Sequence, residues 1–310
     1  MVPKKTMNNQ QQPFFSIVIP TYNRPERLNN CLESMTKLKY PRDRFEIIIV
    51  DDGSQMSLEP VVSPFCSYLE ITLLKQANAG PASARNTGAK QAKGEYLAFT
   101  DDDCMPAPDW LNKLASRFVA QPDYLIGGRT INALSTNLYS AASQQLIDYL
   151  YGYYNHSSEK AQFFASNNIA VPTEIFHKIG GFDTCFPLAA AEDREFCDRW
   201  LQSGYRMIYA AEVCIYHAHY LTLPSFWRQH FFYGRGAFCF HQVCAKRAAK
   251  PIKVEPLSFY LNLLTYPFNQ TSLRPGFIIS WLLFLSQLAA TFGFFWERAH
   301  QTTTIKLSRK

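Results

Sequence analysis

The sequence lacks both the cysteine spacing of a zinc site and the leader of a secreted protein. Its 8 cysteines are scattered over 310 residues without a Cys-x-x-Cys motif, and even the closest pair, Cys239 and Cys244, has no zinc-finger spacing. The first apolar run, Phe14–Ile19, is too short for a signal sequence and leads into Pro20. We therefore expect reduced thiols and a cytoplasmic location.

Nucleotide-binding fingerprints and nucleic-acid-binding patterns are missing too. No Gly-x-Gly-x-x-Gly follows the first predicted strand, and no Gly-x-x-x-x-Gly-Lys-Ser/Thr occurs, which excludes a dinucleotide fingerprint and a P-loop. The net charge of +6 is mild, and no strongly basic run interleaved with aromatic residues occurs, so nucleic acid is not an expected partner. The basic excess gathers late, at Lys246, Arg247, Lys250, Lys253, Lys306, Arg309 and Lys310. Such residues can contact anionic lipid, although a solvated basic surface explains them equally well.

What the chain does have is an alternation of strand and helix signals. With 47% hydrophobic and 15% aromatic residues it can bury a substantial core. Continuous apolar runs predict strands over residues 15–19, 45–50, 71–74 and 96–99. Helical spacing predicts helices that begin near Pro25, Pro81 and Trp110. Buried strands alternating with helices indicate an α/β fold whose parallel sheet is covered on both faces.

Polar residues follow three of these strands, and ligands bind beyond the carboxyl ends of strands in such sheets. The polar clusters are 21–23, 51–54 and the acidic triplet Asp101–Asp103. Two like charges about 4 Å apart repel by ~4 kcal/mol at an effective dielectric of ~20, so a fixed cluster needs a cation. Carboxylates suit Mg²⁺ or Mn²⁺ shared with a bound phosphate. The alternative is a solvated acidic turn that caps the next helix.

The middle and final sections are less regular. Residues 124–131 and 163–171 are predicted strands, and Glu192-Asp193 opens a helix that Gly204 ends. Acidic residues in a first turn also simply complement the helix dipole. Near the C-terminus, Phe259–Phe268 is apolar, and Phe277–Trp296 is a 20-residue apolar stretch. That stretch could span a bilayer, lie on its surface, or form a buried helix or dimer face.

The motifs, in their order along the chain, resemble those of family 2 glycosyltransferases. They are Ser16-Ile-Val-Ile-Pro-Thr-Tyr-Asn-Arg24, Asp51-Asp-Gly-Ser54, Asn78-Ala-Gly-Pro-Ala-Ser-Ala-Arg-Asn86, the acidic triplet, Gly180-Gly-Phe-Asp183 and Glu192-Asp193. The resemblance covers about residues 14–220. It implies the GT-A fold, a Rossmann-like, mostly parallel sheet flanked by helices, followed here by a C-terminal helical apolar extension. Together with the change to an aromatic and basic composition over Ser225–His241 and the apolar runs after it, this divides the chain into a flexible segment 1–12, a GT-A domain 13–222, a membrane-associating helical region 223–300 and a basic tail 301–310.

The resemblance also implies a role for individual residues. Thr21, Tyr22, Asp52, Arg85 and Asp102 would contact the nucleotide sugar.

The metal, Mg²⁺ or Mn²⁺, would be held by Asp101, Asp103 and His217, with His219 as a competitor of His217. Packed polar residues after a strand are the alternative for both histidines. Asp193 would be the catalytic base, with Glu192 beside it.

The implied reaction is metal-dependent, inverting transfer of a sugar from a nucleotide diphosphate sugar to an acceptor hydroxyl, in polysaccharide, glycolipid or other cell-surface glycan synthesis. A cation would neutralise the leaving diphosphate, and a carboxylate would take the acceptor's proton. The acceptor would be a glycan or lipid-linked molecule at the cytoplasmic face of a membrane.

The acceptor side is where this sequence departs from the family. Thr184 stands where relatives often carry an acidic residue, and Pro172 where a basic one is common. Five tyrosines could line an acceptor groove, although helical packing explains them as well: Tyr139, Tyr149, Tyr151, Tyr153 and Tyr154.

Two other functions use the same residue types. A nucleotidyltransferase acting on sugar phosphates would release pyrophosphate and carry a basic glycine-rich loop after the first strand, where this chain has Thr21-Tyr-Asn-Arg-Pro25. A non-catalytic membrane protein that binds sugar nucleotides would need no base at Glu192-Asp193.

Overall fold

A computed structural model describes residues 12–156, 161–186, 190–248 and 255–307. The predicted flexible segment 1–12 lies outside the described residues except for Gln12, and so do Lys250, Lys253, Arg309 and Lys310.

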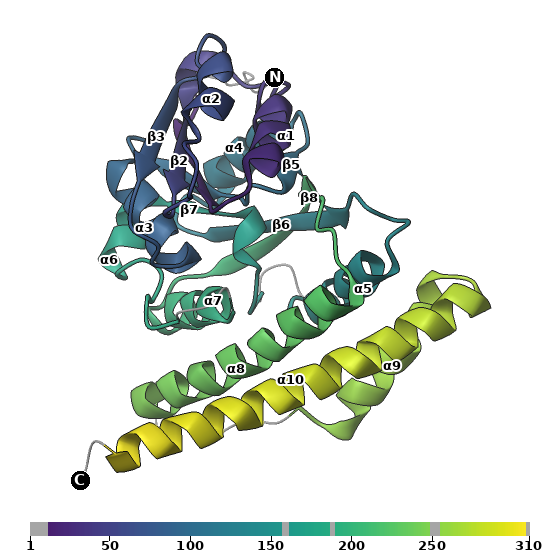
Figure 1. Ribbon diagram of the computed structural model, residues 1–310. Coiled ribbons are helices and arrows are strands. Elements are labelled where there is room, and N and C mark those ends of the chain that lie inside the picture. The colour runs from purple at the N-terminus through teal and green to yellow at the C-terminus, as the bar shows by residue number, and fades with distance from the viewer. Residues whose placement is uncertain (1–11, 157–160, 187–189, 249–254, 308–310) are drawn as a thin grey trace, which may run out of the picture.

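One eight-stranded sheet forms the centre of the molecule (Figure 1). Its strands, in the order in which they pair, are β3 (Ile71–Lys75), β2 (Phe45–Asp51), β1 (Phe15–Thr21), β4 (Tyr96–Phe99), β7 (Ile169–Pro172), β6 (Leu125–Asn132), β8 (Met207–His217) and β5 (Cys104–Pro106). The first four run parallel, as do β6 and β8. β7 is antiparallel to both of its neighbours, and β5 is antiparallel to β8. The predicted strands 15–19, 45–50, 71–74 and 96–99 are confirmed.

Helices cover both faces of the sheet. Their bounds are α1 (Pro25–Met35), α2 (Glu59–Val62), α3 (Pro81–Gln91), α4 (Trp110–Ala120), α5 (Leu138–Tyr154), α6 (Thr173–Lys178) and α7 (Glu192–Gln202), with short 3₁₀ turns at Arg42–Arg44, Ser63–Phe65 and Ser166–Asn168. Ile17 and Ile19 of β1 face the core that contains α1 and α4, whereas Val18 faces the core that contains α3, α6 and α7. Successive side chains of a strand point to opposite faces, so an unbroken apolar run is what a sheet covered on both faces requires. The predicted fold class is confirmed.

The prediction of a strand over 163–171 is wrong for its first half, because Ser166–Asn168 forms a 3₁₀ turn. Asn168 explains the difference. Its side-chain nitrogen donates to the carbonyl oxygens of Arg129 and Val213, and its oxygen accepts from Trp110 Nε1 at 3.0 Å. These buried hydrogen bonds hold the backbone in a turn where the apolar pattern alone suggested an extended strand.

Three long helices form a separate layer below the sheet in Figure 1: α8 (Leu223–Ala248), α9 (Leu257–Gln270) and α10 (Leu273–Leu307). Helices α8 and α10 run side by side, and α10 is the outer of the two. A third core joins this layer to α5, with Leu146, Phe226, Leu263 and Leu283 among its buried residues. The C-terminal region predicted to be helical and apolar therefore packs on the sheet domain.

Candidate active site

The acidic triplet directly follows β4 and is surrounded by cations and a hydroxyl from the first strand and helix. Asp102 and Asp103 are buried. Thr21 Oγ1 donates to Asp102 at 2.8 Å, and Arg24 lies 3.3 Å from the same carboxylate. Arg27 Nη1 lies 2.8 Å from Asp103 Oδ2. The repulsion expected from three adjacent carboxylates is thus offset by side chains that the β1–α1 connection supplies.

Asp101 belongs to a second, buried ion-pair chain. Arg85 of α3 is 3% exposed, and its guanidinium lies 2.7 Å from Asp101 and 3.2 Å from Glu192 at the start of α7. Arg85 also stacks on the Phe182 ring at 5.6 Å. A single buried cation therefore joins the acidic triplet to the carboxylates of α7, two groups that lie about 90 residues apart in the sequence.

Asp103 faces two histidines at the end of β8. Its Oδ1 lies 3.1 Å from His217 Nε2 and its Oδ2 lies 3.5 Å from His219 Nδ1. One ligand atom from each of the three residues lies within 4.8 Å of the others, so together they could hold a metal ion. Both histidines thus lie at the site, and the structure gives no reason to choose between them.

The tautomer of His219 supports a cation at this position. The Gln229 amide nitrogen donates to Ser143 Oγ and Tyr233 OH, so its Oε1 is left to accept from His219 Nε2 at 2.6 Å. A neutral His219 then turns the lone pair of Nδ1 toward a carboxylate, and this buried Nδ1 has no hydrogen-bond partner. Two electron-rich atoms that face each other in a buried site are the arrangement a metal ion stabilises.

Burial and charge shift the pKa values of the triplet in opposite directions. Burial raises the pKa of Asp102 to about 6, with Arg24 opposing the shift and Asp103 adding to it. Burial would also raise the pKa of Asp103, but the neighbouring His217 and His219 side chains outweigh it and hold that pKa well below its usual range. Asp103 is therefore the more acidic carboxylate of this pair.

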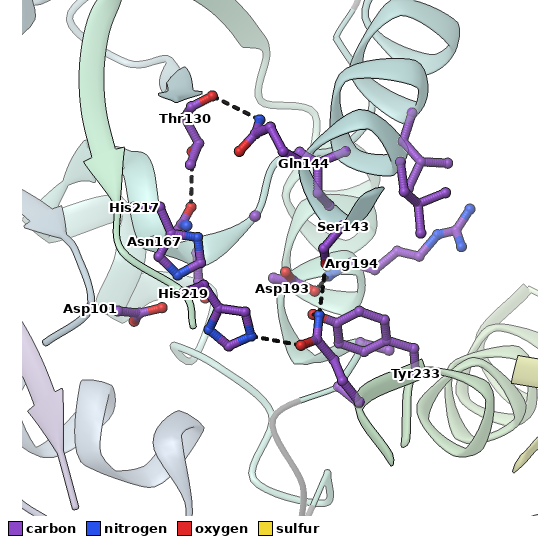
Figure 2. Close-up of a pocket in the computed structure, with 18 of the residues that line it drawn as sticks. Asp101, Thr130, Ser143, Gln144, Asn167, Asp193, Arg194, His217, His219 and Tyr233 are labelled. Atoms are coloured by element: carbon purple, nitrogen blue, oxygen red, sulfur yellow. Dashed lines mark hydrogen bonds between the residues drawn. The ribbon is translucent and has the colours of Figure 1, made fainter. Parts of the chain in front are cut away.

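A cavity of about 350 Å³ opens between this cluster and the start of α7 (Figure 2). Asp101, His217 and His219 lie on one side of it, and Asp193 and Tyr233 lie on the other. Asp193 Oδ1 accepts from the backbone nitrogen of Arg194 at 2.7 Å, and burial raises the pKa of Asp193.

The first turn of α7 holds this carboxylate in place. Ala191, directly before the helix, has a left-handed φ of +71°, which costs a non-glycine residue ~1–3 kcal/mol and is typical of functional sites. Burial, reinforced by Asp193 and opposed by Arg85, raises the pKa of Glu192 to about 7. The Glu192 carboxylate is paired with Arg85, and Asp193 lines the same cavity beside it.

Not all predicted site residues line the cavity. Thr21, Tyr22, Asp52 and Asp102 stand at the ends of β1, β2 and β4, beside it. Asp52 accepts from the backbone nitrogens of Ala79 and Gly80, each at 2.9 Å, and from the Gln76 side chain, so it fixes the loop before α3. Tyr22 is exposed.

The five tyrosines considered for an acceptor groove do not line the cavity either. Tyr149 donates to the Phe259 carbonyl, and Tyr151 is buried in the sheet core. Tyr153 and Tyr154 each donate to Glu255, so these four tyrosines pack or hydrogen-bond within the fold. The same helix instead presents Ser143, Gln144, Leu146, Ile147 and Leu150 to the cavity.

Sequence reasoning missed the residues that α8 contributes. Gln229, Tyr233 and Ala237 line the cavity, beyond the predicted domain limit at residue 222. They lie in a stretch whose aromatic and basic composition suggested a membrane contact. Arg24 and Arg27 were also missed, although two arginines just after a strand that adjoins an acidic triplet are a usable signal.

A mostly parallel sheet whose strand ends carry an acidic triplet, across a cavity from a carboxylate on a later helix, defines a GT-A fold. The family model for glycosyl transferase family 2 matches residues 16–180, and the chain belongs to this family. It is therefore an enzyme, a glycosyltransferase, which argues against both the nucleotidyltransferase and the non-catalytic alternatives.

Individual relatives agree with this. The chain is 29% identical to glycosyltransferase AglE of Haloferax volcanii over 65% of its length and 66% of the relative's. It is 26% identical to the probable glycosyltransferase YdaM of Bacillus subtilis over 93% of its length and 69% of the relative's. Its fold is similar to that of the mannosyltransferase PcManGT from Pyrobaculum calidifontis, solved in complex with GDP-Man and Mn²⁺, with a TM-score of 0.61, 21% identity, and coverage of 97% of this chain and 82% of that one.

Proposed function

We propose that this enzyme transfers a sugar from a nucleotide diphosphate sugar to an acceptor hydroxyl, with inversion and with a divalent cation. One observation carries the proposal: a single cavity is lined by Asp103, His217 and His219 on one side and by Asp193 on the other. The first group could hold a cation that neutralises a leaving diphosphate, and Asp193 could accept a proton.

Asp103, His217 and His219 would hold the cation. Asp101, which is paired with Arg85, would lie beside it. When bound, the cation would stabilise negative charge on the departing diphosphate. The mixed carboxylate and imidazole donors favour Mn²⁺ over Mg²⁺, because Mg²⁺ prefers oxygen ligands. The structurally similar mannosyltransferase, which was solved with GDP-Man and Mn²⁺, supports this choice.

Asp193 acts as the general base. A raised pKa makes its carboxylate a better proton acceptor, and general-base help contributes roughly 10²- to 10⁴-fold to a rate. One displacement at the anomeric carbon inverts its configuration. Glu192, predicted as a catalytic partner, would act by holding Arg85 against Asp101.

The nucleotide would lie along the strand ends beside the cavity, against Thr21, Tyr22, Asp52 and Asp102. Thr21 and Asp102 are already joined by a hydrogen bond, so they form one preorganised polar edge. Arg85, which is paired with Asp101, would contribute a positive charge next to this edge.

The acceptor would enter from the α5 and α8 side, where the cavity wall becomes apolar. Leu146, Ile147, Leu150 and Ala237 line it there, together with Phe163. An apolar wall fits a lipid-linked or glycan acceptor in cell-surface glycan synthesis. All eight cysteines are free thiols, which supports a reducing, cytoplasmic location for the catalytic domain.

A donor screen tests the proposal. Nucleotide sugars are tested for Mn²⁺-dependent thermal stabilisation, since a ligand that binds the native state raises its stability by RT ln(1 + [L]/Kd). The selected donor is then assayed for transfer, and the anomeric configuration of the product is read by NMR. A retained configuration, or transfer that survives EDTA unchanged, would overturn the mechanism.

A further inference from the structure

Helix α10 is apolar on two opposite faces, and only one of them is covered by protein. The covered face consists of Ile279, Leu282, Leu283, Ser286 and Ala289, each at most 6% exposed. The other face consists of Phe277, Trp281, Phe284, Leu288, Phe292 and Phe295, which are 36–66% exposed. The spacing of the exposed set, with steps of three and four residues, follows one side of a helix. Residues Leu273–Gln301 are long and apolar enough to cross a membrane.

The covered face locks α10 onto α8. A Cβ atom added to Gly293 would lie 1.9 Å from the Phe231 carbonyl oxygen, and one added to Gly234 would lie 1.8 Å from that of Ala290. The two backbones are thus in direct contact, which only glycine allows at these positions. Farther along, Arg235 of α8 and Glu297 of α10 form an ion pair at 2.7 Å.

Helix α8 is in turn fixed to the catalytic domain. A Cβ atom on Gly236 would lie 2.5 Å from the Ala190 carbonyl oxygen, just before α7. Arg247 pairs with Asp198 at 3.2 Å and also with Glu195, both on α7. Crossing a bilayer would require α10 to leave α8, or would carry the ion pairs of α8 into hydrocarbon, where charged groups are costly.

The charge distribution identifies what covers the exposed face. Residues 223–310 carry 11 Lys and Arg against 2 Glu, whereas residues 1–222 carry 20 Lys and Arg against 23 Asp and Glu. The basic excess of the whole protein therefore lies in the section that bears the apolar face. Arg228 and Arg274 are exposed in the same section, and so are the aromatic side chains of Trp227 on α8 and Trp281 on α10. Exposed apolar and aromatic residues flanked by basic ones match an anionic lipid surface.

We propose that α10 lies in the plane of an anionic membrane, inserted into one leaflet by its exposed face, and does not cross the bilayer. Helix α10 packs on α8 and, at its N-terminal end, on α5, and α8 remains at the headgroup level. This proposal is independent of the donor and the metal, because it rests on surfaces outside the catalytic cavity.

The binding test is co-sedimentation with phosphatidylcholine vesicles with and without 30% phosphatidylglycerol. The double variant Trp281→Glu/Phe292→Glu should lose at least tenfold in partitioning. A matched control is Met56→Glu/Val119→Glu, two apolar residues that are 68% and 66% exposed, comparable with 59% and 61% for Trp281 and Phe292. The control should partition like the wild type. Equal losses in both variants, or no vesicle binding by the wild-type chain, would overturn the proposal.

Topology is tested on the full chain in membranes. Alkaline carbonate should release the protein, and a tag at its C-terminus should stay on the same side as the catalytic domain, open to protease in the same preparation. Resistance to carbonate with a protected tag would show a spanning helix and overturn the proposal. The proposal would also be overturned if the wild-type chain were a dimer in solution that did not bind vesicles and the double variant were a monomer. The exposed face would then be a contact between two copies of the chain.

Discussion

Replacing Gln229 by leucine tests whether the tautomer of His219 matters for metal binding. In the wild type, His219 Nε2–H donates to Gln229 Oε1 at 2.6 Å, which keeps Nδ1 free as a ligand. Without this acceptor, the proton moves to Nδ1 and donates to Asp103 Oδ2, 3.5 Å away. Hydrogen bonds to charged groups contribute ~1.5–3 kcal/mol, and a metal must now break this one to reach Nδ1. At about 1.4 kcal/mol per tenfold, Mn²⁺ affinity should fall roughly 10- to 100-fold.

The assay is a titration of free Mn²⁺ by its EPR signal, without donor or acceptor. Gln229→Glu is the conservative variant, because its carboxylate still accepts from Nε2, so it should bind Mn²⁺ at least as well as the wild type. Tyr233→Phe removes the other neighbour of the Gln229 amide without touching His219 and should leave the affinity within about twofold. Unchanged Mn²⁺ affinity in a folded Gln229→Leu protein would refute the reasoning.

Three further predictions concern the carboxylates and their cation. Asp193→Asn should lower kcat by ~10²- to 10⁴-fold with the donor Kd unchanged, as measured by steady-state kinetics and calorimetry; normal turnover would exclude it as the base. The pKa of Glu192 is raised from 4.5 to about 7, so its protonation contributes to the free energy of unfolding. This contribution is fully present below pH 4.5 and is lost as the pH rises through 7. Glu192→Gln should therefore match the wild-type Tm near pH 4 and exceed it at pH 8, and the opposite trend would contradict the burial argument. Arg85→Met leaves two carboxylates without their buried cation and should cost about 3 kcal/mol in urea unfolding. A loss of less than about 1 kcal/mol in the free energy of unfolding would show that water solvates the two carboxylates when Arg85 is removed.

The sheet domain was predictable because its strands are buried on both faces. In β1 and β2 nearly every position is apolar and enclosed, so length and composition alone separate them from helices. The antiparallel β7 was harder, since only four of its residues are extended and polar side chains such as Asn168 fix the turn before it. Local patterns do not show hydrogen bonds to strands that are 40 residues away.

The candidate site was predictable in its carboxylates and less so in their partners. Asp101–Asp103 stand out because like charges rarely follow one another at the end of a buried strand. Arg85 could be placed near them only through the family resemblance. The contribution of Gln229 has no local signal, because an isolated glutamine on an aromatic helix becomes meaningful only when β8 brings His219 to it at 2.6 Å.

Helix α8 lies between the catalytic cavity and α10, the helix that we propose binds a membrane. One side of it carries Gln229 and Tyr233 into the cavity, where Gln229 is hydrogen-bonded to His219, a proposed ligand of the cation. Its other side contacts α10 backbone to backbone at Gly234. Helix α8 is thus the direct link between α10, which we propose lies on a lipid surface, and the Gln229–His219 hydrogen bond. The long apolar helix therefore supports the cavity wall through α8, and removing it would expose the face of α8 that it covers.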